Sequence, residues 1–372
     1  MAELVDAHDS NSCGFGRVGS SPTSGTFFLR KALFDDSFEQ GFFFIKSCLR
    51  VAEFSIDWRG NRFKGDKLNE IFMRKVCTAV MVMALFISLS SGATAQINSE
   101  GSLRVIALFA HPDDGDIKMG ATAAMMADMG HEVKFLSITN GNAGHHEQGG
   151  GKLANRRRAE AREAAQRLGI KQYEVMDIHD GELVPSLENR KKIIRKIREW
   201  EADVVIGHRP NDYHPDHRYS GILVKDAAYM VIVPNIVTDV APLESNPVFL
   251  YMEDGFQRPN PFRHDIVVGI DEAYNNRKLD ALDAHVSQFY EWLPWTVGML
   301  DQVPEDPQER RDWLYDHRFQ PNVEGQVLEG LKRWYGDEAA DKFRHAESFE
   351  IAEYGHQPSQ EDIRAIFPML EK

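Results

Sequence analysis

Short apolar runs alternate with amphipathic stretches along the chain from Leu103 to Trp200. The apolar runs have the length of buried strands, and the amphipathic stretches have the length and period of helices. The predicted strands are Arg104–Ala110, Glu132–Thr139, Gln172–Asp177 and Asp203–Gly207. The predicted helices are Ile117–Met129, Leu153–Leu168 and Leu187–Trp200. This alternation predicts an α/β fold with a mostly parallel sheet and helices on both faces.

The chain changes character beyond Pro294, where proline, tryptophan and charged residues become frequent. Helical patterns persist there, for example over Gln326–Tyr335. We therefore predict an α/β domain over residues 103–298, followed by a mainly helical C-terminal extension over residues 299–372.

Residues 73–95 have the form of a secretory signal peptide. Arg74 and Lys75 precede an apolar run, and a small-residue site, Ala93-Thr94-Ala95, ends it. A retained membrane helix is the alternative. A signal peptide predicts an exported protein, periplasmic or extracellular, that meets the membrane only through this segment if it stays uncleaved.

The 72 residues before this segment are expected to lie outside the native protein. Their opening, MAELVDAHDSNSCGFGRVGSSPTSG, resembles the translation of a transfer-RNA gene. We interpret residues 1–72 as a start-site artefact without a stable fold, and Met73 as the true start.

Charge and cysteine content narrow the chemistry. The formal net charge is -14, which disfavours a nucleic-acid partner. The three cysteines, Cys13, Cys48 and Cys77, all precede the predicted domain. A metal in that domain must therefore be held by histidines and carboxylates.

Two polar clusters follow predicted strands. The sequence AHPDD, Ala110–Asp114, ends the first strand, and HPDH, His214–His217, comes shortly after the fourth. Ligands of parallel sheets bind at the carboxyl ends of the strands. His111, Asp114 and His217 form a His₂Asp set of the kind that holds catalytic Zn²⁺.

The residues beside this set suggest the remaining roles. Asp113 is then the general base, and His214 is placed to stabilise an oxyanion. Asp216 is placed to orient an imidazole from behind. The alternative for AHPDD is a helix N-cap in which a carboxylate binds free N–H groups, and the alternative for HPDH is an ordinary polar loop.

With these motifs the sequence resembles the PIG-L/LmbE-like de-N-acetylases over residues 103–295. The resemblance also rests on Arg157-x-x-Glu160-x-x-x-Ala164-x-x-x-Leu168-Gly169 and on HVSQ, His285–Gln288. It implies a Rossmann-like α/β fold and a hydrolase that removes an N-acetyl group from an N-acetylglucosamine-type amino sugar. It also implies one zinc ion per chain, with Fe²⁺ as the alternative metal.

The same resemblance assigns residues. It matches His111, Asp114 and His217 to the zinc ligands, Asp113 to the general base, and His214 to the oxyanion partner. Arg157 matches an arginine near the sugar, with a solvated helix face as its alternative. His285 and Gln288 are interpreted as core or interface residues and left outside the site.

Two other function classes stay open. His111, Asp114 and His217 are also a two-histidine, one-carboxylate set that could hold Fe(II) in an oxygenase. A non-catalytic carbohydrate-binding protein is the second alternative. The sequence leaves open which N-acetylated sugar is the substrate and whether the protein forms a homo-oligomer.

Overall fold

The computed structural model of the chain describes residues 101–370. The predictions for residues 1–72 and 73–95 therefore lie outside the described residues. Within the described part, no helix combines the length and apolar character needed to span a membrane.

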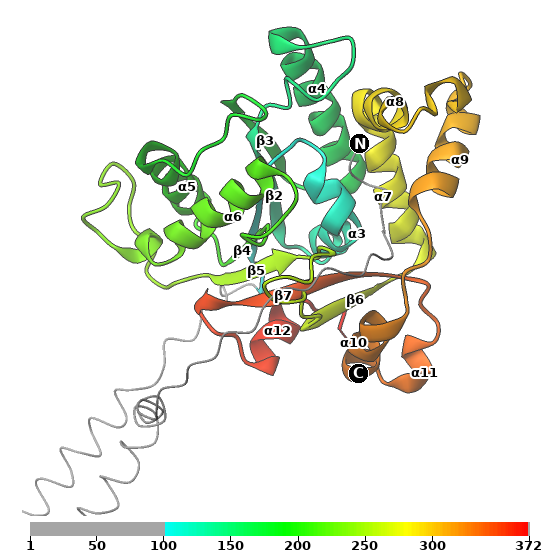
Figure 1. Cartoon of the computed structure of the whole chain (residues 1–372). Coiled ribbons are helices and arrows are strands. Elements are labelled where there is room, and N and C mark those ends of the chain that lie inside the picture. The colour runs from blue at the N-terminus through cyan, green and yellow to red at the C-terminus, as the bar shows by residue number, and fades with distance from the viewer. Residues whose placement is uncertain (1–100, 371–372) are drawn as a thin grey trace, which may run out of the picture. The chain divides into compact units, whose positions relative to one another are not determined.

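The described residues form one sheet of seven strands in the order β3-β2-β1-β4-β5-β7-β6 (Figure 1). The strands are β1 (Arg104–Phe109), β2 (Glu132–Thr139), β3 (Gln172–Ile178), β4 (Val204–Gly207), β5 (Val248–Met252), β6 (Ile266–Ile270) and β7 (His345–Gly355). Strands β1 to β5 pair in parallel, whereas β7 lies antiparallel to both β5 and β6. The predicted α/β fold with a mostly parallel sheet is therefore confirmed.

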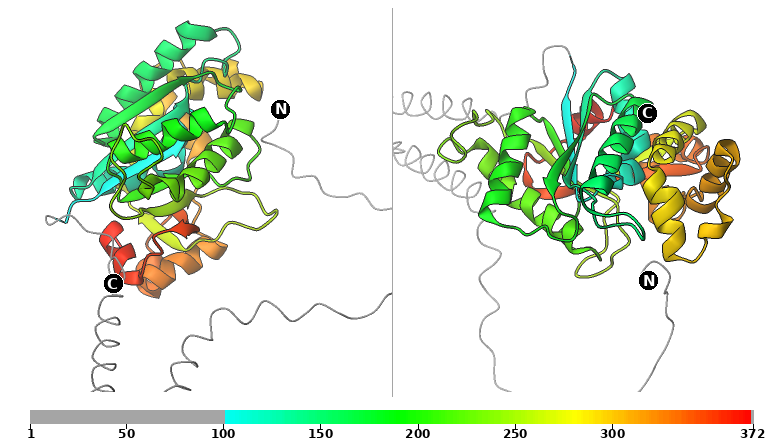
Figure 2. Two further views of the ribbon diagram at one scale, coloured as in Figure 1. Left: turned by 90° about the vertical axis from the view of Figure 1, so that its left-hand side faces the viewer. Right: turned by 90° about the horizontal axis from the view of Figure 1, so that it is seen from above.

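Helices cover both faces of the sheet. They are α3 (Asp114–Asp128), α4 (Gly150–Leu168), α5 (Leu187–Glu199), α6 (Pro215–Ala228), α7 (Glu272–Ala284), α8 (Leu293–Thr296), α9 (Pro307–Arg318), α10 (Gly325–Tyr335), α11 (Asp337–Ala340) and α12 (Gln360–Ile366). A π-helical segment, Ser287–Trp292, connects α7 to α8. Seen from above, α7 to α9 in yellow and orange lie beside teal α4, away from green α5 and α6 (Figure 2).

Strand β1 is buried from both sides, which explains its continuous apolar sequence. Val105, Ala107 and Phe109 join the core formed with α3, α4 and α7. Ile106 and Leu108 point to the opposite face, into the core formed with α5 and α6. Because β1 is packed on both faces, the polar residues 111–114 that follow it emerge at a fixed point on the edge of the sheet.

The four strands and three helices predicted from the pattern are present with small shifts at their ends. Gly169 ends α4 in a left-handed conformation with φ 73°, as expected for a helix C-cap. The expected C-terminal helices are also present. Strands β5, β6 and β7 were not predicted from the sequence, and β7 carries the C-terminal part into the sheet between the other two.

Candidate metal centre

The two polar clusters come together because β1 and β4 are parallel neighbours. Leu108 of β1 pairs with Gly207 of β4, so both strands end at the same edge of the sheet. Residues 111–114 follow β1, and residues 208–217 follow β4 and lead into α6. The helix approaches the strand end closely at Gly221, where a Cβ atom would lie 2.6 Å from the carbonyl oxygen of His208.

The three residues expected to bind a metal converge at this edge. His111 Nδ1 lies 3.2 Å from His217 Nε2 and 3.6 Å from Asp114 Oδ2. His217 Nε2 lies 3.5 Å from Asp114 Oδ1. The structure thus brings together side chains that are 106 positions apart in the sequence.

The outer nitrogen of each imidazole faces a carboxylate. His217 Nδ1 is hydrogen-bonded to Asp212 Oδ1 at 3.0 Å. His111 Nε2 lies 3.1 Å from Asp180 Oδ1 and 3.4 Å from Asp216 Oδ2. These carboxylates favour a proton on the outer nitrogens, so the inner nitrogens present lone pairs to the Asp114 carboxylate.

Lone pairs that face one another repel, a cation between them removes this repulsion, and the spacing fits one. Two ligands of a tetrahedral ion, each about 2.1 Å from it, lie about 3.4 Å apart. The three measured separations, 3.2, 3.5 and 3.6 Å, agree with this value. Three overlapping groups of possible ligands lie at this edge, His111–His214–His217, Asp114–His208–His217 and His111–Asp180–Asp216, and His111 and His217 each belong to two of them.

Asp113 lies at the N-cap position of α3, but its side chain makes no cap hydrogen bond. The N-cap interpretation of this residue is therefore wrong. Asp113 is almost fully buried, and burial together with Asp114 raises its pKa to about 6, against the opposing charge of Arg157, His285 and His111.

Asp114 has a different environment from its neighbour. Its Oδ2 accepts the backbone N–H of His111 at 2.8 Å and lies 3.2 Å from His208 Nε2. Burial opposes ionisation of Asp114, but the neighbouring imidazoles of His217, His111 and His208 hold its pKa well below the usual range. Two adjacent carboxyls therefore differ in proton affinity, which suits one for a ligand and the other for a base.

His214 is the N-cap of α6, and its Nδ1 accepts the backbone N–H of Asp216 at 3.2 Å. A neutral ring in this arrangement carries its proton on Nε2. Burial and the neighbouring His111 and His217 lower the pKa of His214, which favours that neutral form. Its ring lies edge-on to His111 with centroids 4.6 Å apart.

Arg157 is buried and does not lie on a solvated helix face, so that alternative is wrong. Its Nη2 donates to the carbonyl of Gly144 at 2.6 Å and to the side chain of Gln288. Gly141, with φ 65°, makes room for it, because a Cβ there would lie 2.6 Å from Arg157 Cδ. Arg157 thus connects the loop after β2 to the π-helical segment.

His285 lies in the core, as interpreted from the sequence. Its Nε2 is 3.2 Å from Asp116 Oδ2, and the Tyr173 hydroxyl donates to the same oxygen at 2.9 Å. Gln288 instead contacts Arg157.

Three residues near the centre were missed from the sequence: Asp180, His208 and Asp212. Asp180 follows β3, and the other two follow β4, so all three obey the strand-end rule used for the main clusters. His208 also stacks on His217, with ring centroids 4.3 Å apart and planes 12° apart. Burial, followed by the neighbouring His217, lowers the pKa of His208.

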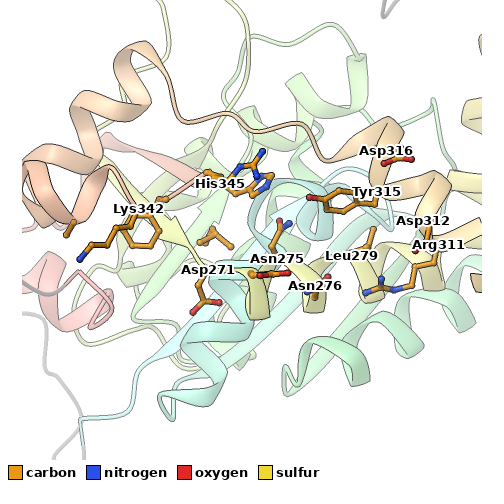
Figure 3. A pocket seen from close by; sticks show the side chains of 15 residues that line it. Asp271, Asn275, Asn276, Leu279, Arg311, Asp312, Tyr315, Asp316, Lys342 and His345 are labelled. Carbon is orange, nitrogen blue, oxygen red and sulfur yellow. The ribbon is translucent and has the colours of Figure 1, made fainter.

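A separate cavity of about 780 Å³ lies between α7, α9 and the segment leading into β7 (Figure 3). Asn275, Tyr315 and His345 are among its lining residues. None of the clustered histidines and aspartates of the metal centre lines it, so this cavity is not where their chemistry takes place.

The fold and the site thus define an α/β protein with a candidate metal centre at the strand ends. A family model described as GlcNAc-PI de-N-acetylase (PIG-L) matches residues 106–228. Diacetylchitobiose deacetylase of Thermococcus kodakarensis is 32% identical over 204 residues, which cover 52% of this chain and 73% of that protein. The chain belongs to the PIG-L family of de-N-acetylases.

Two solved structures share the fold at lower identity. The N,N'-diacetylchitobiose deacetylase of Pyrococcus horikoshii has a TM-score of 0.50 at 24% identity, covering 79% of this chain and 94% of its own. The 4-carboxy-2-hydroxymuconate hydratase GalB of Pseudomonas putida has a TM-score of 0.52 at 19% identity, covering 68% and 98%. One fold thus carries a deacetylase and a hydratase, so the site must decide the reaction.

Proposed function

We propose that this protein is a zinc-dependent hydrolase that removes the N-acetyl group from an N-acetylglucosamine-type amino sugar or glycoconjugate. It would act on a linear amide C–N bond. The observation that carries the proposal is the convergence of His111, Asp114 and His217. Beside them lies Asp113, whose carboxyl group does not cap α3. Membership in a family of de-N-acetylases and the related diacetylchitobiose deacetylase support the substrate class.

His111, Asp114 and His217 would hold the zinc. When bound, zinc acts as a Lewis acid that polarises the acetyl carbonyl and acidifies water. Asp212 would orient His217, while Asp180 and Asp216 would orient His111, through the carboxylate contacts on their outer nitrogens.

Asp113 would take the proton from the attacking water. It suits this role because its carboxyl group makes no hydrogen bond to another described residue, and because Arg157 and His285 supply positive charge nearby. The same proton would then pass to the leaving amine nitrogen as the C–N bond breaks.

His214 would donate its Nε2–H to the oxyanion that forms at the acetyl carbonyl. The backbone bond to its Nδ1 holds the ring in the tautomer that has this donor. Arg157 would shape the sugar-binding site, because its hydrogen bond to Gly144 holds the loop after β2 in place.

The fold gives no support to the oxygenase alternative. Two-histidine, one-carboxylate oxygenases are expected on an antiparallel β-scaffold, whereas the clusters here follow parallel strands. Export to the periplasm or beyond stays a prediction that rests on residues 73–95.

Acetate release tests the proposal. The purified protein, loaded with zinc, is incubated with N-acetylated sugars, chito-oligosaccharides and acetylated peptides. We expect acetate from amino sugars, loss of activity after chelation, and recovery on adding zinc. No acetate from any sugar in the zinc-loaded protein would contradict the proposed function.

A further inference from the structure

The separate cavity between α7, α9 and the segment leading into β7 has the size of a small-molecule site. Its volume is about 780 Å³. Sites for small ligands measure roughly 300–1,000 Å³ and combine apolar surface with a few polar groups. Here Ile270 and Leu279 supply buried apolar surface, and most of the other lining residues are polar or charged. The cavity thus fits a polar ligand with small apolar parts.

Two polar side chains in the middle of the cavity have no hydrogen-bond partner (Figure 3). Asn275 is only 6% exposed, yet its carboxamide makes no hydrogen bond to another described residue. The imidazole of His345 is also without a partner within residues 101–370. Burial, followed by Arg344 and Lys278, lowers the pKa of His345, so a neutral ring with one donor and one acceptor lines the cavity. Buried polar groups are normally paired, so Asn275 and His345 point to a hydrogen-bonding ligand.

Unpaired positive charge lies at one end of the cavity, where Figure 3 shows Lys342. Lys342 and Arg344 both line the cavity, and neither forms an ion pair with any residue that the structure describes. We call these two residues the basic end. Asp271 lies nearby, but its carboxylate caps α7 by accepting the Tyr274 N–H at 3.0 Å, and Glu272, which also lines the cavity, is exposed to solvent. The basic end is therefore suited to the carboxylate of a ligand.

Negative charge gathers at the opposite end of the cavity. Asp312 and Asp316, one turn apart on α9, line it there, and we call them the acidic end (Figure 3). The neighbouring Arg311 is already paired with Asp280 at 2.7 Å. In the described part of the chain, no lysine or arginine pairs with either carboxylate of the acidic end. Because like charges four residues apart on a helix repel, this end is suited to the ammonium group of a ligand.

We propose that this cavity binds a short peptide with free termini, which places its carboxylate at the basic end and its ammonium group at the acidic end. Asn275 lies between the two ends, and its carboxamide offers a donor and an acceptor, as the pairing of a peptide group requires. The buried apolar surface of Ile270 and Leu279 suits small side chains. The residues of the metal centre take no part, because none of them lines the cavity.

Titration calorimetry with trialanine on the full-length protein tests the proposal. Two blocked peptides are compared with it: N-acetyl-trialanine, which lacks the ammonium group, and trialanine amide, which lacks the carboxylate. We expect trialanine to bind, and each blocked peptide to bind at least about fivefold more weakly, because each loses one pair of opposite charges. Equal affinities for the three peptides, or no binding of trialanine, would overturn the proposal.

Two substitutions of exposed residues test the direction in which the peptide lies. Lys342→Gln should weaken trialanine binding about two- to fivefold and leave the affinity for trialanine amide unchanged. Asp316→Asn should weaken trialanine binding by a similar factor and leave the affinity for N-acetyl-trialanine unchanged. Lys225→Gln is the matched control, since Lys225 is an exposed lysine in the last turn of α6, and we expect no change from it. Unchanged trialanine binding in both Lys342→Gln and Asp316→Asn would contradict the assignment to this cavity.

Chelation separates this cavity from the metal centre. The trialanine titration is repeated on the wild-type protein after zinc has been removed by a chelator. We expect the same affinity, because the peptide would contact no residue of the metal centre. Loss of trialanine binding on chelation would place the peptide at the metal centre and overturn the proposal, whether or not the protein releases acetate from sugars.

Discussion

Asp212 holds His217 through a hydrogen bond of 3.0 Å between Oδ1 and Nδ1. The same Asp212 oxygen accepts the backbone N–H of His214, so one carboxylate fixes both the loop and the imidazole. Because this bond keeps the proton on Nδ1, the Nε2 lone pair faces Asp114 and His111.

Replacing Asp212 by alanine is therefore expected to weaken zinc binding about 10- to 100-fold, although Asp212 is not itself a ligand. Zinc affinity is measured by competition with a chromophoric chelator. Asp239→Ala is the control, because Asp239 is exposed and pairs with Arg195 elsewhere on the surface. Equal zinc affinity in wild type and Asp212→Ala would show that His217 is oriented by other means.

Substitution of His111 or His217 by alanine, or of Asp114 by asparagine, should each remove zinc from the purified protein and abolish turnover. Each change deletes one of three converging donors, and two donors hold the ion poorly. Metal content per chain is measured by mass spectrometry. His179→Ala, a change at a largely exposed histidine after β3, should keep full occupancy. Full zinc in His217→Ala would remove that residue from the proposed ligands.

Asp113→Asn should keep zinc but lower kcat about 10²- to 10⁴-fold, because the amide cannot accept the proton of the attacking water. Metal analysis and single-turnover kinetics on the same preparation separate the two effects. Loss of zinc together with activity would indicate that Asp113 is a ligand and not a base.

Arg198→Met should lower the free energy of unfolding by about 3 kcal/mol or more. The Arg198 guanidinium is buried and donates to six backbone carbonyls, those of Met230, Val231, Val233, Ile236, Val237 and Val240. Methionine fills similar space but leaves these carbonyls without a donor.

Denaturant unfolding measures this loss. Arg195→Met, three residues earlier on α5, removes only a solvent-exposed pair with Asp239 and should cost less than about 1 kcal/mol. Similar costs at the two positions would contradict a special role for the buried arginine.

His131 should make the fold less stable as the pH falls. Burial lowers its pKa below the ordinary 6.5, and its Nδ1 accepts the Leu103 N–H at 3.1 Å. The unfolded chain therefore binds a proton more readily, so this contribution to stability is complete above pH 6.5 and declines below it. Unfolding free energies at pH 7.5 and pH 5 should differ less in His131→Gln than in the wild type. An identical difference would exclude His131 as a source of the decline.

The sequence by itself determined the central half of the sheet. Residues 105–110 and 204–206 are continuously apolar, because these strand segments are buried on both faces. AHPDD and HPDH were recognisable for the same reason. Polar clusters that come within a few residues of a buried strand contrast with its apolar sequence.

Only the tertiary structure decided the rest. Strand β7 enters the sheet between β5 and β6, although it begins 75 residues after β6 ends, and such pairing depends on long-range contacts that local pattern does not encode. The burial of Arg157 was hidden in the same way, since the surrounding NRRRAEAR sequence suggests a solvated helix face until Gly144 and Gln288 are packed against it. The partners of the site, Asp180 and Asp212, became visible only when three strand ends were brought to one edge, because imidazole orientation is fixed by contacts in space.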